Sequence, residues 1–257
     1  MNKSISQTLA GEVPEAEWKA RLELAACYRL VAEFGWSDLA ATHISVRVPG
    51  PEHHFLINPY GVLFDEITAS SLVKVDLDGQ VVGSRSSINP AGFIIHGAIH
   101  MARPELSCVL HTHTPAGAAV ATQRDGLLPI TQQALVIFDD VAYHDYEGAA
   151  LNLGERERIL EDLGEKRILI LRNHGLLTVG RTVGEAFVTM YRIERACRYQ
   201  LAFQAAGVPA YPLTEEVRLR TVEQGRKIYG QGGFAQPGAE WESLLARLDR
   251  RDPSYRQ

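Results

Sequence analysis

Apolar residues recur along this chain at two spacings, one typical of helices and the other typical of strands. The wider spacing, of three to four residues, places apolar side chains on one face of a helix. Gly35 supplies a stop for the first such run, and Gly207-Val208-Pro209 supplies a stop for the longest. We therefore expect helices over residues 14–34, 93–102, 115–122, 154–163, 182–206, 213–229 and 241–248.

The narrower spacing, of two residues, marks the apolar segments that lie between these helices. Pro49-Gly50 and Asp78-Gly79 are turn signals that end two of these segments. Three strands should therefore meander before the strand that begins at Cys108, and residues 128–133 should form a loop. We expect strands over residues 39–50, 53–61, 72–77, 108–113, 141–143 and 167–174.

This order of elements predicts one αβα domain from about Trp18 to Gly207, followed by a helical appendage over residues 208–257. The sequence shows neither an internal repeat nor a low-complexity linker between the two. With 257 residues, of which 46% are hydrophobic, the chain can build a sizeable core.

Charge and cysteine content narrow the class of protein. The formal net charge is -5 and no run of Lys or Arg forms a basic stripe, which argues against nucleic acid as a partner. Cys27, Cys108 and Cys197 are far apart and outside any metal-binding spacing, so we interpret them as buried thiols of a reducing compartment. No segment approaches about 20 uninterrupted apolar residues, and the N-terminus lacks an apolar signal core. We therefore expect a cytoplasmic protein that does not interact with membranes.

Two histidines stand one residue apart at the end of an apolar run, in Val109-Leu110-His111-Thr112-His113. If this run is a strand, its period of two places both imidazoles on the same face. The alternative is two polar side chains without a metal, but each buried imidazole without a partner would then cost about 1–3 kcal/mol. The spacing therefore favours metal binding by His111 and His113.

A third candidate ligand, His174, follows the buried run Ile168-Leu169-Ile170-Leu171. A single histidine at a strand end is more often hydrogen-bonded than a ligand. Together with the pair, however, it gives the three protein ligands typical of a catalytic metal site, which leaves one position for water or substrate.

The remaining histidines and several acids fit this chemistry less well. His96 and His100 are one helical turn apart, but Gly97 stands where a zinc protease helix would carry its glutamate. We expect His53, His54 and His144 to be solvated in turns. We also expect solvated charges at Asp65, Glu66, Asp139, Asp140 and Glu147.

Six motifs together make the sequence similar to a known family. They are Thr42-His43-Ile44-Ser45-Val46-Arg47, Ile57-Asn58-Pro59-Tyr60-Gly61, Asn89-Pro90-Ala91-Gly92, Arg103-Pro104, His111-Thr112-His113 and Asn173-His174-Gly175. In this order, the chain resembles the class II aldolase and adducin-head family over about Trp18 to Gly207. The resemblance implies a three-layer αβα fold around a central, largely antiparallel sheet, and commonly a cyclic tetramer with active sites between subunits. It also implies that His111, His113 and His174 hold a divalent metal, usually zinc, with iron or manganese as alternatives.

The sequence departs from the sugar-phosphate aldolases of this family at positions that matter for catalysis. Those enzymes carry a Ser-Ser-Glu triplet in which the serines bind phosphate and the glutamate is an acid–base group; this chain has Pro90-Ala91-Gly92 there. A Gly-Asn pair and a Thr-Gly pair of the family correspond to Thr42-His43 and Tyr60-Gly61. The resemblance thus predicts a metal site without the catalytic carboxylate and without side chains for phosphate.

Three functions remain open on these grounds. The one we favour is a metal-dependent carbon–carbon lyase, of aldolase or decarboxylase type, acting on a small unphosphorylated keto or hydroxy acid. His43, Tyr60 and His96 are then the candidates to replace the missing proton carrier. The alternatives are a non-haem iron oxygenase on the same triad, as some family members are, and a non-catalytic assembly module similar to the adducin head.

Overall fold

The computed structural model describes residues 11–84, 86–148, 154–230, 233, 235 and 237–257. Its centre is one eight-stranded mixed sheet with the strand order β4-β3-β2-β1-β5-β8-β7-β6. Every neighbouring pair is antiparallel except β6 and β7, which are parallel. The strands are β1 (Ile44–Arg47), β2 (Phe55–Ile57), β3 (Val73–Val75), β4 (Val81–Val82), β5 (Cys108–Thr112), β6 (Val141–His144), β7 (Ile168–Leu171) and β8 (Gly175–Gly180).

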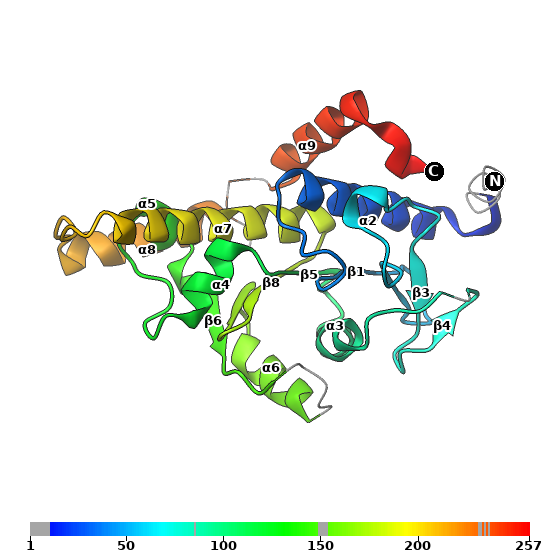
Figure 1. Cartoon of the computed structure of the whole chain (residues 1–257), viewed down its shortest axis with the longest axis horizontal. Coiled ribbons are helices and arrows are strands. Elements are labelled where there is room, and N and C mark those ends of the chain that lie inside the picture. The colour runs from blue at the N-terminus through cyan, green and yellow to red at the C-terminus, as the bar shows by residue number, and fades with distance from the viewer. Residues whose placement is uncertain (1–10, 85, 149–153, 231–232, 234, 236) are drawn as a thin grey trace.

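Helices cover both faces of this sheet, which confirms the predicted three-layer αβα class. Figure 1 shows α2 and α7 on one side of the sheet and α3 and α6 on the other. The helices are α2 (Glu15–Glu33), α3 (Pro90–Ala102), α4 (Pro115–Thr122), α5 (Gln132–Leu135), α6 (Glu155–Leu163), α7 (Val183–Ala205), α8 (Glu215–Tyr229) and α9 (Pro237–Arg251). Short 3-10 turns are η1 (Phe64–Glu66), η2 (Phe138–Asp140) and η3 (Pro253–Arg256).

The alternation of side chains along β5 divides the interior into two layers. Cys108 and Leu110 pack in the cluster that also contains α2 and α7 residues, whereas Val109 packs in the cluster with Ile95 and Ile99 of α3. Because successive side chains of a strand point to opposite faces, His111 lies on the α3 side of the sheet.

The C-terminal helices add to this core. Trp241 and Leu248 of α9 and Tyr255 of η3 are buried in the same cluster as α2 and α7. α8 follows an exposed connection after α7. The division of the chain into a domain and an appendage at residue 207 stays a prediction.

Several local predictions were wrong. His144 is 3% exposed rather than solvated, because it belongs to β6 and α6 packs over that strand. Part of the loop predicted over residues 128–133 is helical, since Thr131 caps α5 by accepting a hydrogen bond from the backbone N–H of Ala134. His174 lies in the turn between β7 and β8, not within a strand.

The buried cysteines agree with the sequence, because Cys27, Cys108 and Cys197 are all free thiols inside the protein. Within the part of the chain that the structure describes, no helix combines the length and the apolar character needed to cross a membrane.

Candidate metal centre

Three imidazoles meet beside the end of β5. The Nε2 atom of His113 lies 2.8 Å from Nε2 of His111 and 2.9 Å from Nε2 of His174. One nitrogen from each ring lies within 4.8 Å of the other two, and the described residues contain no other cluster of this kind. The sequence-predicted triad is therefore brought together in space.

The other ring nitrogen identifies the tautomer of two of these residues. His111 Nδ1 lies 2.9 Å from the carbonyl oxygen of Leu176, and His113 Nδ1 lies 3.0 Å from a carboxylate oxygen of Asp38. Both oxygens accept hydrogen bonds, so both Nδ1 atoms carry the hydrogen, and the neutral form of each ring has its lone pair on Nε2. Metal-binding histidines are commonly held in this way by carbonyl or carboxylate groups.

Burial lowers the pKa of two of the three rings, His111 and His174. The pKa of His111 is well below its usual range, mainly because the ring is buried and also because His43 and His174 are close. Burial and the neighbouring His113 lower the pKa of His174 to about 4. Neutral lone pairs that converge within 3 Å repel one another unless a cation lies among them, so this set of donors fits a divalent metal ion.

The turn between β7 and β8 delivers His174 to the site. Asn173 adopts φ +56°, a left-handed conformation that asparagine tolerates better than most residues. A side chain at Gly175 would collide with the backbone oxygen of Thr112, and its Cβ would lie 3.1 Å from Cδ2 of His113. Glycine at this position therefore allows β8 to approach the end of β5.

A second group of histidines lies beside the triad, between α3 and the sheet. His43 precedes β1, and its ring centroid is 5.3 Å from that of His111. His43 Nδ1 is 2.9 Å from His96 Nε2, while Ser45 Oγ is 2.7 Å from both His96 Nδ1 and His100 Nε2. These four residues are at most 2% exposed. His96 and His100 thus bind a serine of β1 and do not belong to the triad of His111, His113 and His174.

The His43 ring occupies the space in front of Gly92. A Cβ atom at position 92 would lie 2.9 Å from His43 Cγ and 3.0 Å from its Cδ2. A Cβ atom does not approach a ring this closely without displacement, so a side chain at position 92 would force the His43 ring or its surroundings to shift.

The third catalytic candidate, Tyr60, is placed differently. Its side chain is 58% exposed, and among the described residues its hydroxyl makes no hydrogen bond. Its catalytic role, like those of His43 and His96, stays a prediction.

Sequence reasoning missed Asp38, Ser45 and His100. Asp38 lies in a loop whose partner, His113, is 75 positions away, so no local pattern indicated the contact. Ser45 and His100 did carry a signal. His43 and Ser45 are two residues apart at the start of a strand, and His96 and His100 are four apart on a helix, so each pair shares a face.

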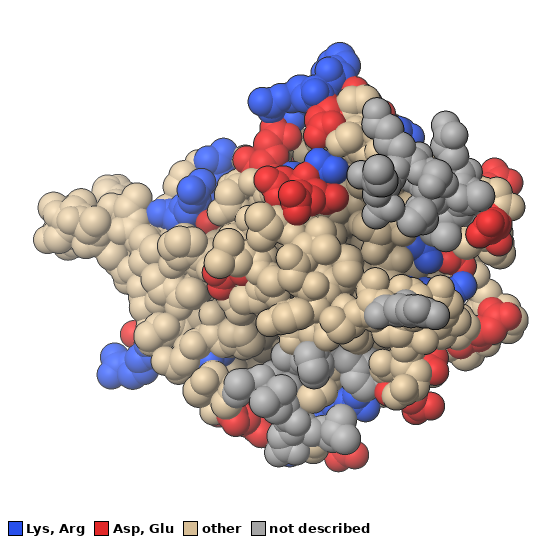
Figure 2. All heavy atoms as spheres, turned by 45° about the vertical axis from the view of Figure 1, so that its right-hand side comes forward, with Lys and Arg blue, Asp and Glu red and all other residues tan. Residues whose placement is uncertain are grey.

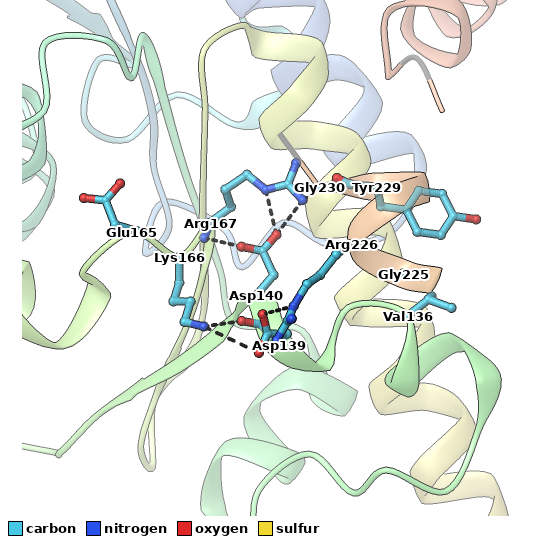
Figure 3. A pocket seen from close by; sticks show the side chains of 10 residues that line it. All are labelled: Val136, Asp139, Asp140, Glu165, Lys166, Arg167, Gly225, Arg226, Tyr229 and Gly230. Atoms are coloured by element: carbon cyan, nitrogen blue, oxygen red, sulfur yellow. Dashed lines mark hydrogen bonds and ion pairs between the residues drawn. The ribbon is translucent and has the colours of Figure 1, made fainter. Parts of the chain in front are cut away.

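The remaining polar candidates have partners outside this centre. His144 binds Asp162 and Glu155 of α6 through its two ring nitrogens, at 2.7 and 3.3 Å. A separate cavity has a volume of about 280 Å³. Figure 3 shows Asp139 and Asp140 in its lining, paired with Arg226 and Arg167. None of the triad residues lines that cavity. Glu147 binds Arg158, and Asp65 and Glu66 are exposed.

Comparison with known proteins gives matches over most of the chain. The family described as Class II Aldolase and Adducin N-terminal domain matches residues 22–201. The crystal structure of an aldolase II superfamily protein from Pseudomonas syringae is 47% identical, covers 97% of this chain and 99% of its own, and superposes with a TM-score of 0.88. L-fuculose 1-phosphate aldolase from Glaciozyma antarctica PI12 is 32% identical over 95% of this chain and 93% of its own, with a TM-score of 0.78. Alpha-adducin from Mus musculus is 49% identical over 194 residues, which are 74% of this chain and 26% of the adducin.

Proposed function

The chain belongs to the Class II Aldolase and Adducin N-terminal domain family, and from that premise we propose that it is a metal-dependent carbon–carbon lyase. Its substrate would be a small unphosphorylated keto or hydroxy acid, and zinc is the expected ion. One observation carries the proposal: the Nε2 atoms of His111, His113 and His174 converge, with neighbouring pairs 2.8 and 2.9 Å apart.

Each ligand has a defined role in this proposal. The three Nε2 lone pairs would hold the ion, while Leu176 and Asp38 fix the orientation of two of the rings. A bound divalent ion supplies Lewis acidity that polarises a substrate carbonyl. Three protein ligands leave a coordination position for that carbonyl oxygen.

His43 is the side chain that we propose to accept and return the proton of the substrate. Its ring is next to that of His111, and its Nε2 atom has no hydrogen-bond partner among the described residues. Burial and the neighbouring His113 and His174 lower the pKa of His43 to about 3, so the ring is neutral and Nε2 or Nδ1 carries a lone pair near pH 7. His43 also fills the space beside Gly92 that an acidic side chain would need. Acid–base assistance typically contributes about 10²- to 10⁴-fold in rate when the pKa of the group is near the working pH, so His43 with a pKa of about 3 would be a weaker base and would contribute less.

We propose an unphosphorylated substrate because the phosphate-binding side chains that the resemblance assigns are replaced in this chain. The positions that the resemblance assigns to phosphate-binding side chains hold Pro90, Ala91 and Tyr60, and Thr42 is fully buried with an unpaired hydroxyl. Proline and alanine offer no side-chain donor to an anion. L-fuculose 1-phosphate aldolase, by its name, acts on a phosphorylated sugar, so we expect the substrate of this chain to differ from that of this relative.

A second candidate function follows from the match to alpha-adducin, which is 49% identical over 194 residues. In that case the domain would serve as a non-catalytic assembly module. The triad and its two supporting acceptors support the enzyme instead, because a module without chemistry has no need for them.

A substrate screen tests the proposal. Zinc-loaded protein should cleave at least one member of a panel of unphosphorylated keto and hydroxy acids, and His174→Ala should abolish that cleavage. His53→Asn, at an exposed position far from the triad in sequence, is the matched control and should retain activity. Substrate-dependent oxygen uptake with ferrous iron would show an oxygenase and contradict the lyase. No turnover with any metal would favour the assembly module.

A further inference from the structure

The group His43, His96, Ser45 and His100 forms an unbroken chain of three short hydrogen bonds, of 2.9, 2.7 and 2.7 Å. It starts beside the metal triad and ends inside the protein, between α3 and β1. All four side chains are at most 2% exposed, so water does not compete for these bonds. We call these four residues the imidazole chain.

A neutral imidazole chain can be fully hydrogen-bonded in only two ways. Among the described residues, Ser45 Oγ is hydrogen-bonded only to His96 and His100, so its single hydrogen is used only if one of these histidines donates to it and the other accepts from it. A neutral imidazole has one N–H and one lone pair, so the choice made at Ser45 passes through His96 to His43. The position of the hydrogen on His43 is therefore coupled to His100, two links away.

Burial keeps the three histidines of the imidazole chain neutral. The pKa values of His43 and His100 are each lowered to about 3, in both cases mainly by burial. The charge of Arg47 further disfavours protonation of His100. The pKa of His96 is also well below its usual range because of burial and of the histidines around it.

His100, at the buried end of the imidazole chain, favours one of the two hydrogen arrangements. His100 Nε2 is bound to Ser45, which leaves Nδ1 as the free nitrogen, without a hydrogen bond of ordinary geometry. The backbone of Leu106 raises the pKa of His100, which is the effect of a carbonyl oxygen that faces an N–H of the ring. An N–H facing a carbonyl oxygen is attractive, whereas a lone pair facing it is repulsive. The hydrogen of His100 therefore belongs on Nδ1.

We infer that Ser45, His96 and His100 are positioning residues that lock His43 in the tautomer with its hydrogen on Nδ1. In this arrangement Ser45 donates to His100 Nε2, His96 Nδ1 donates to Ser45, and His43 Nδ1 donates to His96 Nε2. Nε2 of His43 then carries a lone pair, on a ring whose centroid is 5.3 Å from that of His111. The inference deepens the proposed function, on which it rests, because a proton acceptor at this atom is what the lyase requires.

The tautomer can be observed without any assay of activity. In protein labelled with ¹⁵N-histidine, long-range proton–nitrogen spectra separate ring nitrogens that carry a hydrogen from those with a lone pair. The signals of His43 are assigned by their disappearance in His43→Gln. We expect a hydrogen on Nδ1 and a lone pair on Nε2, both in zinc-loaded protein and after removal of zinc by a chelator.

Substitutions two links away give the decisive comparison. Ser45→Ala should shift the His43 signals toward a mixture of the two tautomers, and Ser45→Thr, which retains the hydroxyl, should restore them. Thr178→Ala is the matched control, because Thr178 is also a fully buried hydroxyl of the sheet but binds Ala186 instead. If Ser45→Ala does not fold, His100→Gln tests the same coupling, because it replaces the imidazole on the other side of Ser45.

The outcomes are distinct. A hydrogen on Nε2 of His43 in the unsubstituted protein, or a His43 tautomer unchanged by both Ser45→Ala and His100→Gln, would overturn the inference. Failure of the lyase assay with the expected tautomer shift intact would overturn only the proposed function. If lyase activity is found, Ser45→Ala should lower kcat more than it raises KM. Its effect should also be largely lost in a His43→Gln background, because both changes act through one ring.

Discussion

At the scale of single residues, the tightest packing near the triad is between Gly92 and the ring of His43. Gly92→Ala would place a Cβ atom 2.9 Å from His43 Cγ, and overpacking of this kind costs about 1–3 kcal/mol. In a His43→Ala background the remaining close contact of this Cβ atom is Ile57 Cδ1 at 3.2 Å, so the same substitution should cost less there. Urea unfolding of the two single variants and the double variant measures this coupling. Equal effects of Gly92→Ala in both backgrounds would contradict the packing.

Asp38 is predicted to act through His113. Its carboxylate accepts the Nδ1 hydrogen of that ring at 3.0 Å, and loss of such a partner typically weakens metal binding about 10- to 100-fold. Asp38→Ala, which removes the acceptor, should therefore weaken zinc affinity by this factor in competition with a chromophoric chelator. Asp125→Ala is the control, because Asp125 is also an exposed acid and is paired with its neighbour Arg124. An unchanged affinity of Asp38→Ala would remove this aspartate from the site.

How well single residues could be predicted depended on where their partners lie. The period of two placed His111 and His113 on one face, and the structure brings His174 to them; metal binding itself stays a prediction. His144 was misread because the groups that bury it, Glu155 and Asp162, belong to a helix that follows later in the chain. Its own neighbourhood in the sequence contains no sign of that helix packing over it.

At the scale of elements, the hairpin of β7 and β8 determines whether the triad can form. Gly175→Ala would collide with the backbone of Thr112, so β8 must move away from β5 and carry His174 with it. We expect loss of zinc binding together with a lower midpoint of thermal unfolding. Gly11→Ala is a suitable control, since a Cβ atom there meets nothing within 4 Å. Full zinc binding by Gly175→Ala would show that the hairpin has more room than the structure indicates.

The buried His100 side chain, between α3 and the sheet, makes the free energy of unfolding depend on pH. The pKa of His100 is about 3 in the folded chain, against an ordinary value of 6.5, so below pH 6.5 the unfolded chain binds a proton that the folded chain does not. The contribution of His100 to the free energy of unfolding is therefore fully present above about pH 6.5. It decreases as the pH falls toward 3. In metal-free protein, His100→Asn should flatten the decrease in urea midpoint between pH 6.5 and 5. His53→Asn, at an exposed position, should leave this decrease unchanged. If the urea midpoints of both variants fall equally with pH, the low pKa assigned to His100 is contradicted.

Most long elements were predictable because their own periodicity defines them. The helices α2, α6 and α7 lie within a residue or two of their predicted ends, and the meander of β1, β2 and β3 was expected. β4, of two residues, and α5, of four, were missed because segments this short have no period to detect. Their formation depends on pairing with β3 and on contact with α7 and α8.

At the scale of the whole molecule, one exposed feature lacks charge entirely. Residues 206–214, between α7 and α8, contain no charged side chain, although 22% of the chain is charged. Figure 2 shows this end of the molecule as an uncharged projection. Val208 and Tyr211 on it are 57% and 88% exposed. Exposed apolar surface of this kind is typical of an interface, and we propose a second copy of this chain as its partner, in line with the homotetramer implied by the family resemblance.

Sedimentation velocity tests this assembly. Val208→Ser combined with Tyr211→Ser should shift the oligomer toward monomer at a given concentration. Leu219→Ser is the matched control, because Leu219 is 62% exposed but lies within α8. A monomeric unsubstituted protein, or an oligomer insensitive to the double substitution, would show that the projection has another role.

The metal content of the purified protein tests the central claim most directly. Elemental analysis of protein purified with divalent metals in the medium should find about one ion per chain, because three converging histidine nitrogens form one site. His111→Ala and His174→Ala should each lose that ion, while His53→Asn should retain it. A protein that binds no ion at any supplied concentration of zinc, iron or manganese would contradict the account.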